Sequence, residues 1–99
     1  MTAHNGGWVY ILANRKNGAL YTGVTSDIAA RMVQHREGKG SAFCREHGIG
    51  RLVHLEHHDR IEDAIAREKS VKKWRRAWKI ELIESGNPDW RDRWFEILA

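Results

Sequence analysis

The sequence predicts a small α+β domain in which helices pack on a three-stranded antiparallel sheet. Two observations lead to this fold class. Aromatic and β-branched residues form strand-like runs near the start and in the middle of the chain, whereas apolar residues recur with helical spacing between and after these runs. The predicted order of elements is therefore strand, strand, helix, strand, helix, helix.

The chain opens with a predicted β-hairpin. Residues 8–13 are rich in aromatic and β-branched side chains, which favours a buried strand. Residues 14–18 have the composition of a turn and end on a glycine, and residues 19–24 read as the second strand. In a register near Tyr10 opposite Tyr21, the two tyrosines stand side by side on one face, either as an ordinary aromatic pair or as part of a site.

The middle of the chain predicts a helix, a loop and a third strand. Asp27 is a helix N-cap candidate, and helical spacing continues from there over residues 28–37 until Gly38 ends it. Glycines punctuate residues 39–50, which predicts a loop. Residues 51–57 then predict the third strand.

The rest of the chain predicts helices. Residues 61–84 contain neither glycine nor proline, which predicts a long helical stretch with a break near 71–74. Asn87 and Pro88 predict the cap and the first position of a last short helix.

Length and composition limit the function classes. The 99 residues suit one domain, which we expect to span 1–99 with a core at about 8–86 and a helical extension at 87–99. Lysine and arginine number 17 against 13 acidic residues, and the net charge of +4 favours an anionic partner such as nucleic acid. The single cysteine, Cys44, excludes an internal disulfide and suits a reducing cytosol. No apolar run approaches the roughly 20 residues that span a bilayer and no export signal opens the chain, so we expect a cytoplasmic protein without a membrane partner.

Polar residues fall where the helices should meet the sheet. Arg31 and His35 are neighbours near the apolar stripe of the first predicted helix. Glu68 projects close to the inner face of the second. A carboxylate placed there must be paired, hydrogen-bonded or bound to a metal. The purely structural alternative is an ion pair of Glu68 with Arg31 or with Lys72.

Taken in order, these residues resemble the GIY-YIG nuclease superfamily. Its two tripeptides resemble Trp8-Val9-Tyr10 and Tyr21-Thr22-Gly23, and Arg31 and His35 follow at similar spacing. The later segments 64–69, 73–79 and 87–90 are similar to the small stand-alone bacterial members. The resemblance covers roughly residues 8 to 94.

The resemblance implies a metal-dependent endonuclease that hydrolyses phosphodiester bonds in DNA. Tyr10 and Tyr21 resemble the paired motif tyrosines, one of which deprotonates or orients the attacking water. Arg31 resembles the arginine that stabilises the phosphorane charge, and His35 the assisting histidine. Glu68 resembles the sole protein ligand of one divalent cation, Mg²⁺ or Mn²⁺, which would polarise the scissile phosphate.

Other positions agree with the family pattern or depart from it. Gly23 resembles the motif glycine that allows close approach of backbone or substrate. Trp8 stands where the first motif glycine is expected, and Thr22 replaces the isoleucine. Many active members carry an asparagine about a dozen residues after the metal glutamate, and Ile80 occupies that place here. This departure favours an alternative, a catalytically weak or inactive nucleic-acid-binding module of the same fold.

The densest basic stretch is a candidate nucleic-acid-binding surface. It comprises Lys72, Lys73, Arg75, Arg76 and Lys79, interleaved with Trp74 and Trp78. Such a surface binds phosphates without sequence preference, although a solvated helix face would show the same pattern. The tryptophan-rich end of the chain, with Trp90 and Trp94, predicts core packing or a homodimer contact. A structural or protein-interaction role for that end is a third reading of the chain.

Overall fold

The computed structural model describes residues 6–98 and confirms the α+β class. Its elements, in chain order, are β1 (Gly7–Ala13), β2 (Leu20–Thr25), α1 (Ile28–Arg36), α2 (Ala42–His47), β3 (Arg51–His58), α3 (Ile61–Lys72), α4 (Arg76–Gly86) and α5 (Trp94–Leu98). The strands form one antiparallel sheet in the order β2-β1-β3, so β1 is central and β2 is an edge strand. None of the helices described within 6–98 is both long and apolar enough to cross a membrane.

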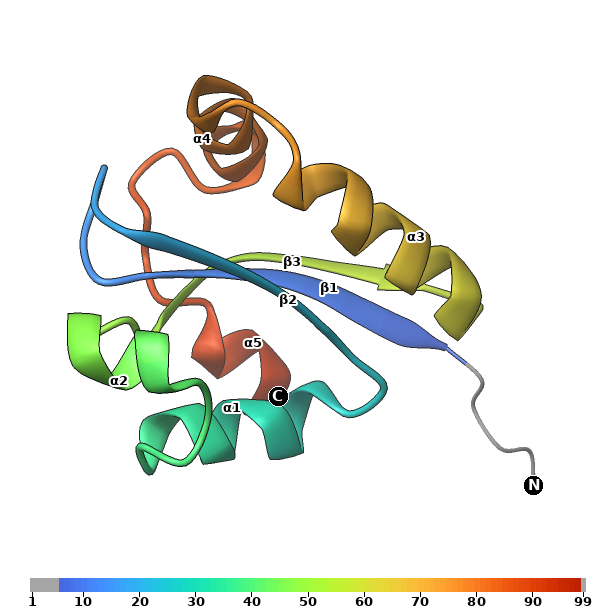
Figure 1. Cartoon of the computed structure of the whole chain (residues 1–99), viewed down its shortest axis with the longest axis horizontal. Helices are drawn as coiled ribbons and strands as arrows, with labels where there is room; N and C mark the ends of the chain where they lie inside the picture. The colour runs from blue at the N-terminus through green and yellow to red at the C-terminus, as the bar shows by residue number, and fades with distance from the viewer. Residues whose placement is uncertain (1–5, 99) are drawn as a thin grey trace.

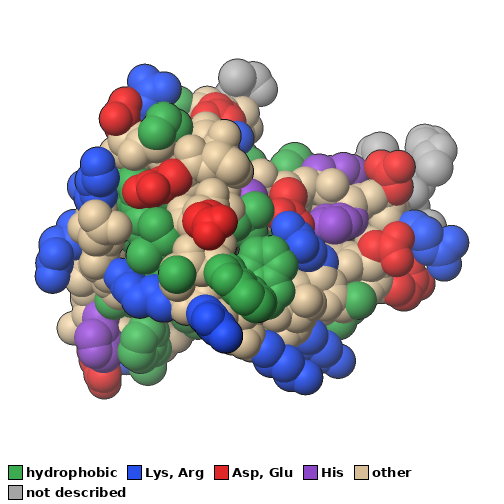
Figure 2. Space-filling view, turned by 90° about the horizontal axis from the view of Figure 1, so that it is seen from above, with side chains coloured by type: hydrophobic (Ala, Val, Ile, Leu, Met, Phe, Trp, Pro, Cys, Tyr) green, Lys and Arg blue, Asp and Glu red, His purple; other side chains and the backbone are tan. Residues whose placement is uncertain are grey.

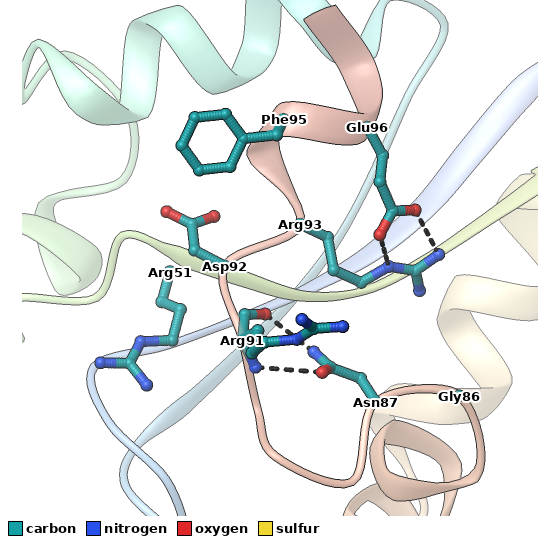
Figure 3. Close-up of a pocket in the computed structure, with 8 residues that line it drawn as sticks. All are labelled: Arg51, Gly86, Asn87, Arg91, Asp92, Arg93, Phe95 and Glu96. Atoms are coloured by element: carbon teal, nitrogen blue, oxygen red, sulfur yellow. Dashed lines mark hydrogen bonds and ion pairs between the residues drawn. The ribbon is translucent and has the colours of Figure 1, made fainter. Parts of the chain in front are cut away.

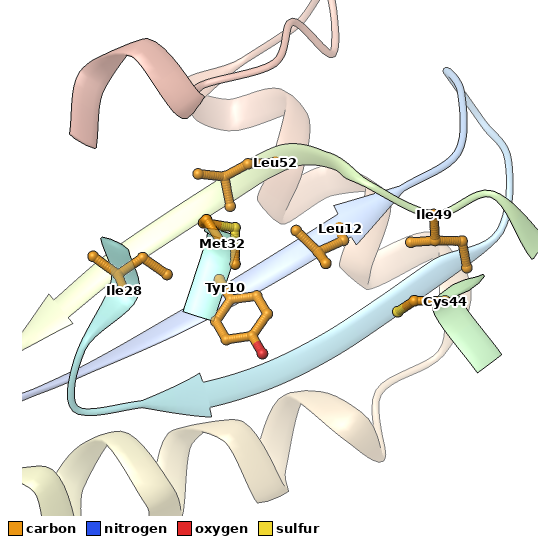
Figure 4. Close-up of a cluster of buried hydrophobic side chains, with 7 residues drawn as sticks. All are labelled: Tyr10, Leu12, Ile28, Met32, Cys44, Ile49 and Leu52. Carbon is orange, nitrogen blue, oxygen red and sulfur yellow. The ribbon is translucent and has the colours of Figure 1, made fainter. Parts of the chain in front are cut away.

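The sheet separates two layers of helices. Helices α3 and α4 cover one face, and α1, α2 and α5 cover the other (Figure 1). Side chains alternate between the faces of β1, which gives each layer its own core. The core on the α1 side contains Tyr10, Leu12, Ile28, Met32, Cys44, Ile49 and Leu52 (Figure 4), and the core on the α4 side contains Ile11, Ala13, Val53, Val71, Ile83 and Trp90.

The hairpin register differs from the predicted one by two residues. Tyr10 pairs with Gly23, and Tyr21 pairs with Leu12. Because side chains alternate with a period of two, this shift leaves both tyrosines on the same face. They are diagonal neighbours with ring centroids 6.5 Å apart.

The predicted loop at 39–50 is partly wrong, because it contains the short helix α2. The Ser41 hydroxyl caps this helix and accepts hydrogen bonds from the backbone N–H groups of Phe43 and Cys44. Gly48 ends it in the left-handed conformation, with φ of 64°. Cys44 is the buried residue of α2, so the helix lacks the repeated apolar spacing that would have predicted it.

The break predicted near 71–74 is confirmed, since α3 ends at Lys72 and α4 begins at Arg76. The predicted role of Asn87 as N-cap of the last helix is wrong, because Asn87 instead follows the end of α4 as its C-cap. The buried Asn87 amide group donates to the carbonyl oxygen of Val53 at 3.1 Å and so holds a turn against β3. The last helix begins at Trp94, whose N–H bonds the Asp92 carboxylate at 3.1 Å.

The two C-terminal tryptophans differ in burial, and both pack on the hydrophobic cores. Trp90 is fully buried in the core on the α4 side, and its indole N–H donates to Glu84 at 2.7 Å. Trp94 is half-buried against the core on the α1 side. A homodimer through this segment stays a prediction, and it would have to use residues other than Trp90.

Candidate active site

The centre of the candidate site is Tyr10, which β1 holds fully buried with its ring over Gly23 of β2. A Cβ atom at position 23 would lie 2.4 Å from both Cζ and the hydroxyl oxygen of Tyr10. The glycine of the second tripeptide is therefore required by the packing of the first tripeptide's tyrosine. The hairpin register thus positions Tyr10 against Gly23 and builds the strand side of the site.

Helix α1 contributes His35 to the same cluster. The Nε2 atom of His35 lies 3.3 Å from the Tyr10 hydroxyl, within hydrogen-bond distance. The His35 ring centroid is 5.9 Å from that of Tyr10 and 5.7 Å from that of Tyr21. Its Nδ1 atom is buried and has no hydrogen-bond partner among residues 6–98. Gly40 lies against this atom, since a Cβ there would approach it to 2.4 Å.

Burial and Arg31 set the charge state of the cluster. Burial raises the pKa of Tyr10 to about 12, although the nearby Arg31 guanidinium acts in the opposite direction. Burial and the same guanidinium both lower the pKa of His35. At neutral pH, Tyr10 is therefore a protonated phenol and His35 a neutral imidazole, and the phenol O–H can donate to Nε2 when the ring proton is on Nδ1.

Glu68 lies in the other layer, on α3. Its side chain is only 9% exposed, and its Oε2 atom is 2.6 Å from Nζ of Lys72, four residues along the helix. Of the two partners that the sequence left open, the structure therefore selects Lys72. The hydrogen bond to Glu68 raises the pKa of Lys72, and an ionised Tyr21 would raise it further, which places Tyr21 within electrostatic range of this pair.

The structure thus brings four predicted residues together and places the fifth in a neighbouring position. Tyr10, Tyr21, Arg31 and His35 share the α1 face of the sheet, as their contacts and electrostatic effects show. Glu68 comes from the opposite layer. Since β2 is an edge strand, the two parts can meet only around its free edge.

Glu68 can serve as a single carboxylate ligand. Within the described part of the chain, no group of three or more His, Cys, Asp or Glu residues is arranged to hold a metal ion. Mg²⁺ needs no such group, because it keeps several waters and often takes one or two carboxylates together with substrate phosphates. Glu68 fits that donor set if Lys72 moves away.

Three members of the predicted basic stretch already make contacts within the protein, and Lys72 is one of them through its ion pair with Glu68. The Arg76 guanidinium donates to the carbonyl oxygens of Asn17 at 2.7 Å and Gly18 at 2.6 Å, which ties α4 to the β1–β2 turn. Nζ of Lys79 donates to the Lys72 carbonyl oxygen at 3.3 Å, at the end of α3. These contacts use groups that the sequence had suggested for phosphate binding.

The other two members, Lys73 and Arg75, are exposed, and Arg75 borders an exposed apolar patch on the α3–α4 face. Figure 2 shows hydrophobic side chains at the surface of this face, with both basic and acidic side chains around them. Trp78 is 49% exposed, and Trp74 packs edge-on against it. The Arg75 guanidinium lies 5.3 Å from the Trp78 ring centroid, and Lys73 is exposed nearby in the chain. This part of the stretch is free to meet an external anion.

Sequence reasoning missed a network centred on Glu56 of β3. The Glu56 carboxylate contacts Nε2 of His54 at 2.8 Å, Nε2 of His58 at 2.9 Å and Nε of Arg67 at 2.8 Å. Burial acts to raise the pKa of Glu56, but these three hydrogen-bond partners outweigh it and hold that pKa below its usual range. The alternation of His54, Glu56 and His58 on one face of a strand was the available signal, whereas Arg67 could be placed only by the fold.

A cavity of about 660 Å³ lies at another place, between the start of β3 and α5 (Figure 3). Its lining residues are Arg51, Gly86, Asn87, Arg91, Asp92, Arg93, Phe95 and Glu96, and they include no predicted site residue. Much of its charge is paired internally, since Arg93 bonds Glu96 and Asp92 bonds Arg36. The cavity is therefore not part of the candidate active site.

The α+β fold and its partly buried tyrosine–histidine–arginine cluster define a small domain of the GIY-YIG type. A model of the family described as the GIY-YIG catalytic domain matches residues 6–81, and the chain belongs to this family. It is 39% identical over 83 residues to a UPF0213 protein of Syntrophus aciditrophicus, with 83% of this chain and 93% of that protein covered. It is 34% identical over 79 residues to a UPF0213 protein of Staphylococcus saprophyticus, with 80% and 95% covered.

A solved structure is also similar. The solution NMR structure of a UPF0213 protein from Bacillus halodurans matches with a TM-score of 0.56 and 33% sequence identity. The match covers 88% of this chain and 92% of that chain. The similarity therefore extends over most of the domain and not only over the tripeptides.

Proposed function

We propose that the protein is an endonuclease that hydrolyses phosphodiester bonds in DNA, with water as the nucleophile and one divalent cation. Membership of the GIY-YIG catalytic domain family supports a nuclease-like role. The observation that carries the proposal is the hydrogen-bonded pair of the buried Tyr10 and the half-buried His35, with Arg31 beside it and Glu68 in the opposite layer.

In this mechanism Tyr10 and His35 move a proton together. A phenol with a pKa of about 12 is protonated at neutral pH and cannot act as a base by itself. The neutral Nε2 of His35 can take the Tyr10 proton, while the Tyr10 oxygen takes a proton from the attacking water. The lowered pKa of His35 keeps the imidazole ready to accept. Tyr21, which is less buried, would orient the water or the phosphate.

Two cationic groups would stabilise the phosphate. The Arg31 guanidinium, beside the Tyr10 hydroxyl, would bind the charge that develops on the phosphorane oxygens. Glu68 would hold the cation, Mg²⁺ or Mn²⁺. When bound, that cation polarises the scissile phosphate and its leaving oxygen.

The exposed Lys73, and Arg75 over the Trp78 ring, would contact the DNA backbone outside the site. Guanidinium and ammonium groups bind phosphates without reading the sequence. Because Arg76 and Lys79 already bond carbonyl oxygens within the protein, we assign them a smaller part in binding than the sequence suggested.

The test is nicking of supercoiled plasmid and of branched DNA with Mg²⁺ or Mn²⁺, comparing wild type with Glu68→Gln. The substitution keeps the size of the side chain and removes the charge that holds the cation, so cleavage should fall by about 100-fold or more. Glu62→Gln is the matched control, since Glu62 is an exposed glutamate of the same helix. Wild-type protein that cleaves with neither metal, or Glu68→Gln protein as active as wild type, would refute the proposal.

One observation favours the alternative, a nucleic-acid-binding module without turnover. Glu68 is already neutralised by Lys72, as in a purely structural ion pair. Such a module would bind DNA with a strong dependence on salt, would not cleave it, and would bind it equally well with and without divalent cations.

A further inference from the structure

We propose that Lys72 is the resident counter-ion of Glu68 and that a divalent cation must displace its ammonium group in order to bind. Lys72 would then set the affinity of the site for the cation and keep that affinity low. The inference rests on the proposed function, because it takes Glu68 as the metal ligand.

The two partners of this ion pair are unequally buried. The Glu68 side chain is 9% exposed, whereas that of Lys72 is 54% exposed, and their contact distance is 2.6 Å. A long lysine side chain on the surface can swing into water at little cost, because its ammonium group is readily hydrated. The carboxylate is held by its burial. The pair can therefore open only by movement of Lys72, which leaves Glu68 in place.

Competition follows from chemistry and charge. The ammonium group and the cation would both bind the Glu68 carboxylate, and they repel each other at close range. In the absence of a cation, Lys72 neutralises the largely buried Glu68 carboxylate, which would otherwise be an unpaired and destabilising charge. Removing Lys72 should therefore strengthen binding of the cation by about tenfold. This effect lies between the interaction energy of a solvent-screened surface ion pair and that of unscreened charges in contact.

Helix α3 offers a matched control. Lys69 is an exposed lysine of the same helix and makes no ion pair with the carboxylates of the described residues. Lys69→Met removes one positive charge from the same helix, as Lys72→Met does. It accounts for the general effect of net charge on cation binding, so the difference between the two variants isolates the contact with Glu68.

The experiment is titration with Mn²⁺ alone, without DNA, in which electron paramagnetic resonance reports free Mn²⁺. We expect Lys72→Met to bind Mn²⁺ about tenfold more tightly than wild type, Lys69→Met to stay within about twofold, and Glu68→Gln to lose the site. Equal or weaker binding by Lys72→Met would overturn the proposal, as would unchanged binding by Glu68→Gln.

A second measurement covers the case in which Lys72→Met fails to fold. In wild-type protein, the ¹⁵N-detected ammonium resonance of Lys72 should shift and exchange faster with water on addition of Mg²⁺, while that of Lys69 should not. An unchanged Lys72 resonance at saturating Mg²⁺ would overturn the proposal. Failure of the nuclease function would appear separately, as no cleavage by wild type whichever way these titrations come out.

Discussion

The hydroxyl group of Tyr10 should make the stability of the protein fall at high pH. Because burial raises its pKa from 10 to about 12, the folded state holds the phenol proton over a range in which the unfolded chain releases it. The stabilisation is fully present below pH 10 and is lost as the pH rises toward 12. A difference of about two pKa units corresponds to about 3 kcal/mol of unfolding free energy.

The curves of unfolding free energy against pH for Tyr10→Phe and for the wild type should therefore cross. At pH 8 the variant should be less stable by about 1–2 kcal/mol, because Nε2 of His35 loses its partner while Nδ1 already has none among the described residues. By pH 12 the wild type has lost more than this difference and the variant should be the more stable of the two. Urea denaturation at a series of pH values from 8 to 12 measures both curves. Tyr21→Phe is the control. It keeps Tyr10, so its unfolding free energy must still decline as the pH rises.

The chain has only two tyrosines, which allows a direct check. In Tyr21→Phe protein, tyrosinate absorbance at 295 nm reports Tyr10 alone, and circular dichroism at the same pH confirms that the protein is folded. We expect ionisation well above pH 10. Ionisation of folded protein near pH 10, or stability curves of wild type and Tyr10→Phe that run parallel, would show that this hydroxyl is not held as described.

Three further results are expected. Glu56→Gln should lower the unfolding free energy by about 2 kcal/mol in urea denaturation at pH 7, because charge-assisted hydrogen bonds are lost. Since the pKa of Glu56 is lowered in the folded state, the difference from wild type should shrink as the pH falls below about 4.3. A difference that stays constant with pH would contradict the network. Gly23→Ala should cost about 1–3 kcal/mol and reduce cleavage, because its Cβ must displace the Tyr10 ring; unchanged melting and cleavage would contradict this packing. Replacing Lys73 and Arg75 with alanine should flatten the slope of log affinity against log salt by up to about 1.8 in fluorescence anisotropy, and an unchanged slope would show that both face solvent.

The elements with strong local patterns were predictable from the sequence. The hairpin, α1, β3 and the pair α3–α4 each carry the alternation or helical spacing that their burial requires. The break between α3 and α4 could also be expected, because a helix of that length is unusual in so small a domain. These predictions use only neighbours along the chain.

Features that depend on distant contacts were not predictable. Asn87 has the residue type of a helix cap, but its amide bonds β3, which the sequence cannot place beside it. The hairpin register depends on packing of the Tyr10 ring over Gly23. The network of Glu56 needs Arg67 from α3, eleven positions further along the chain.

The candidate site was predictable as a set of residues and not as a geometry. Arg31, His35 and Glu68 stood out because each is polar near an apolar face. Whether Glu68 pairs with Arg31 or with Lys72 could not be decided from the sequence. Lys72 follows Glu68 by four residues on the same helix, and Arg31 lies near the inner face of a different helix. The fold decides it: Arg31 and Glu68 belong to helices on opposite faces of the sheet, so only Lys72 is close enough.

This choice of partner changes what Glu68→Gln should do to stability. Had Glu68 paired with a buried arginine, the substitution would strand a charge and cost about 3–5 kcal/mol. Lys72 is 54% exposed and can be solvated when its partner loses its charge, so we expect a loss of about 1 kcal/mol or less. In a thermal melt this is a decrease of at most about 8 °C for a domain of this size. A folded variant that no longer cleaves would then show that Glu68 serves the chemistry, whereas a loss of several kcal/mol would show that the carboxylate serves mainly the stability of the fold.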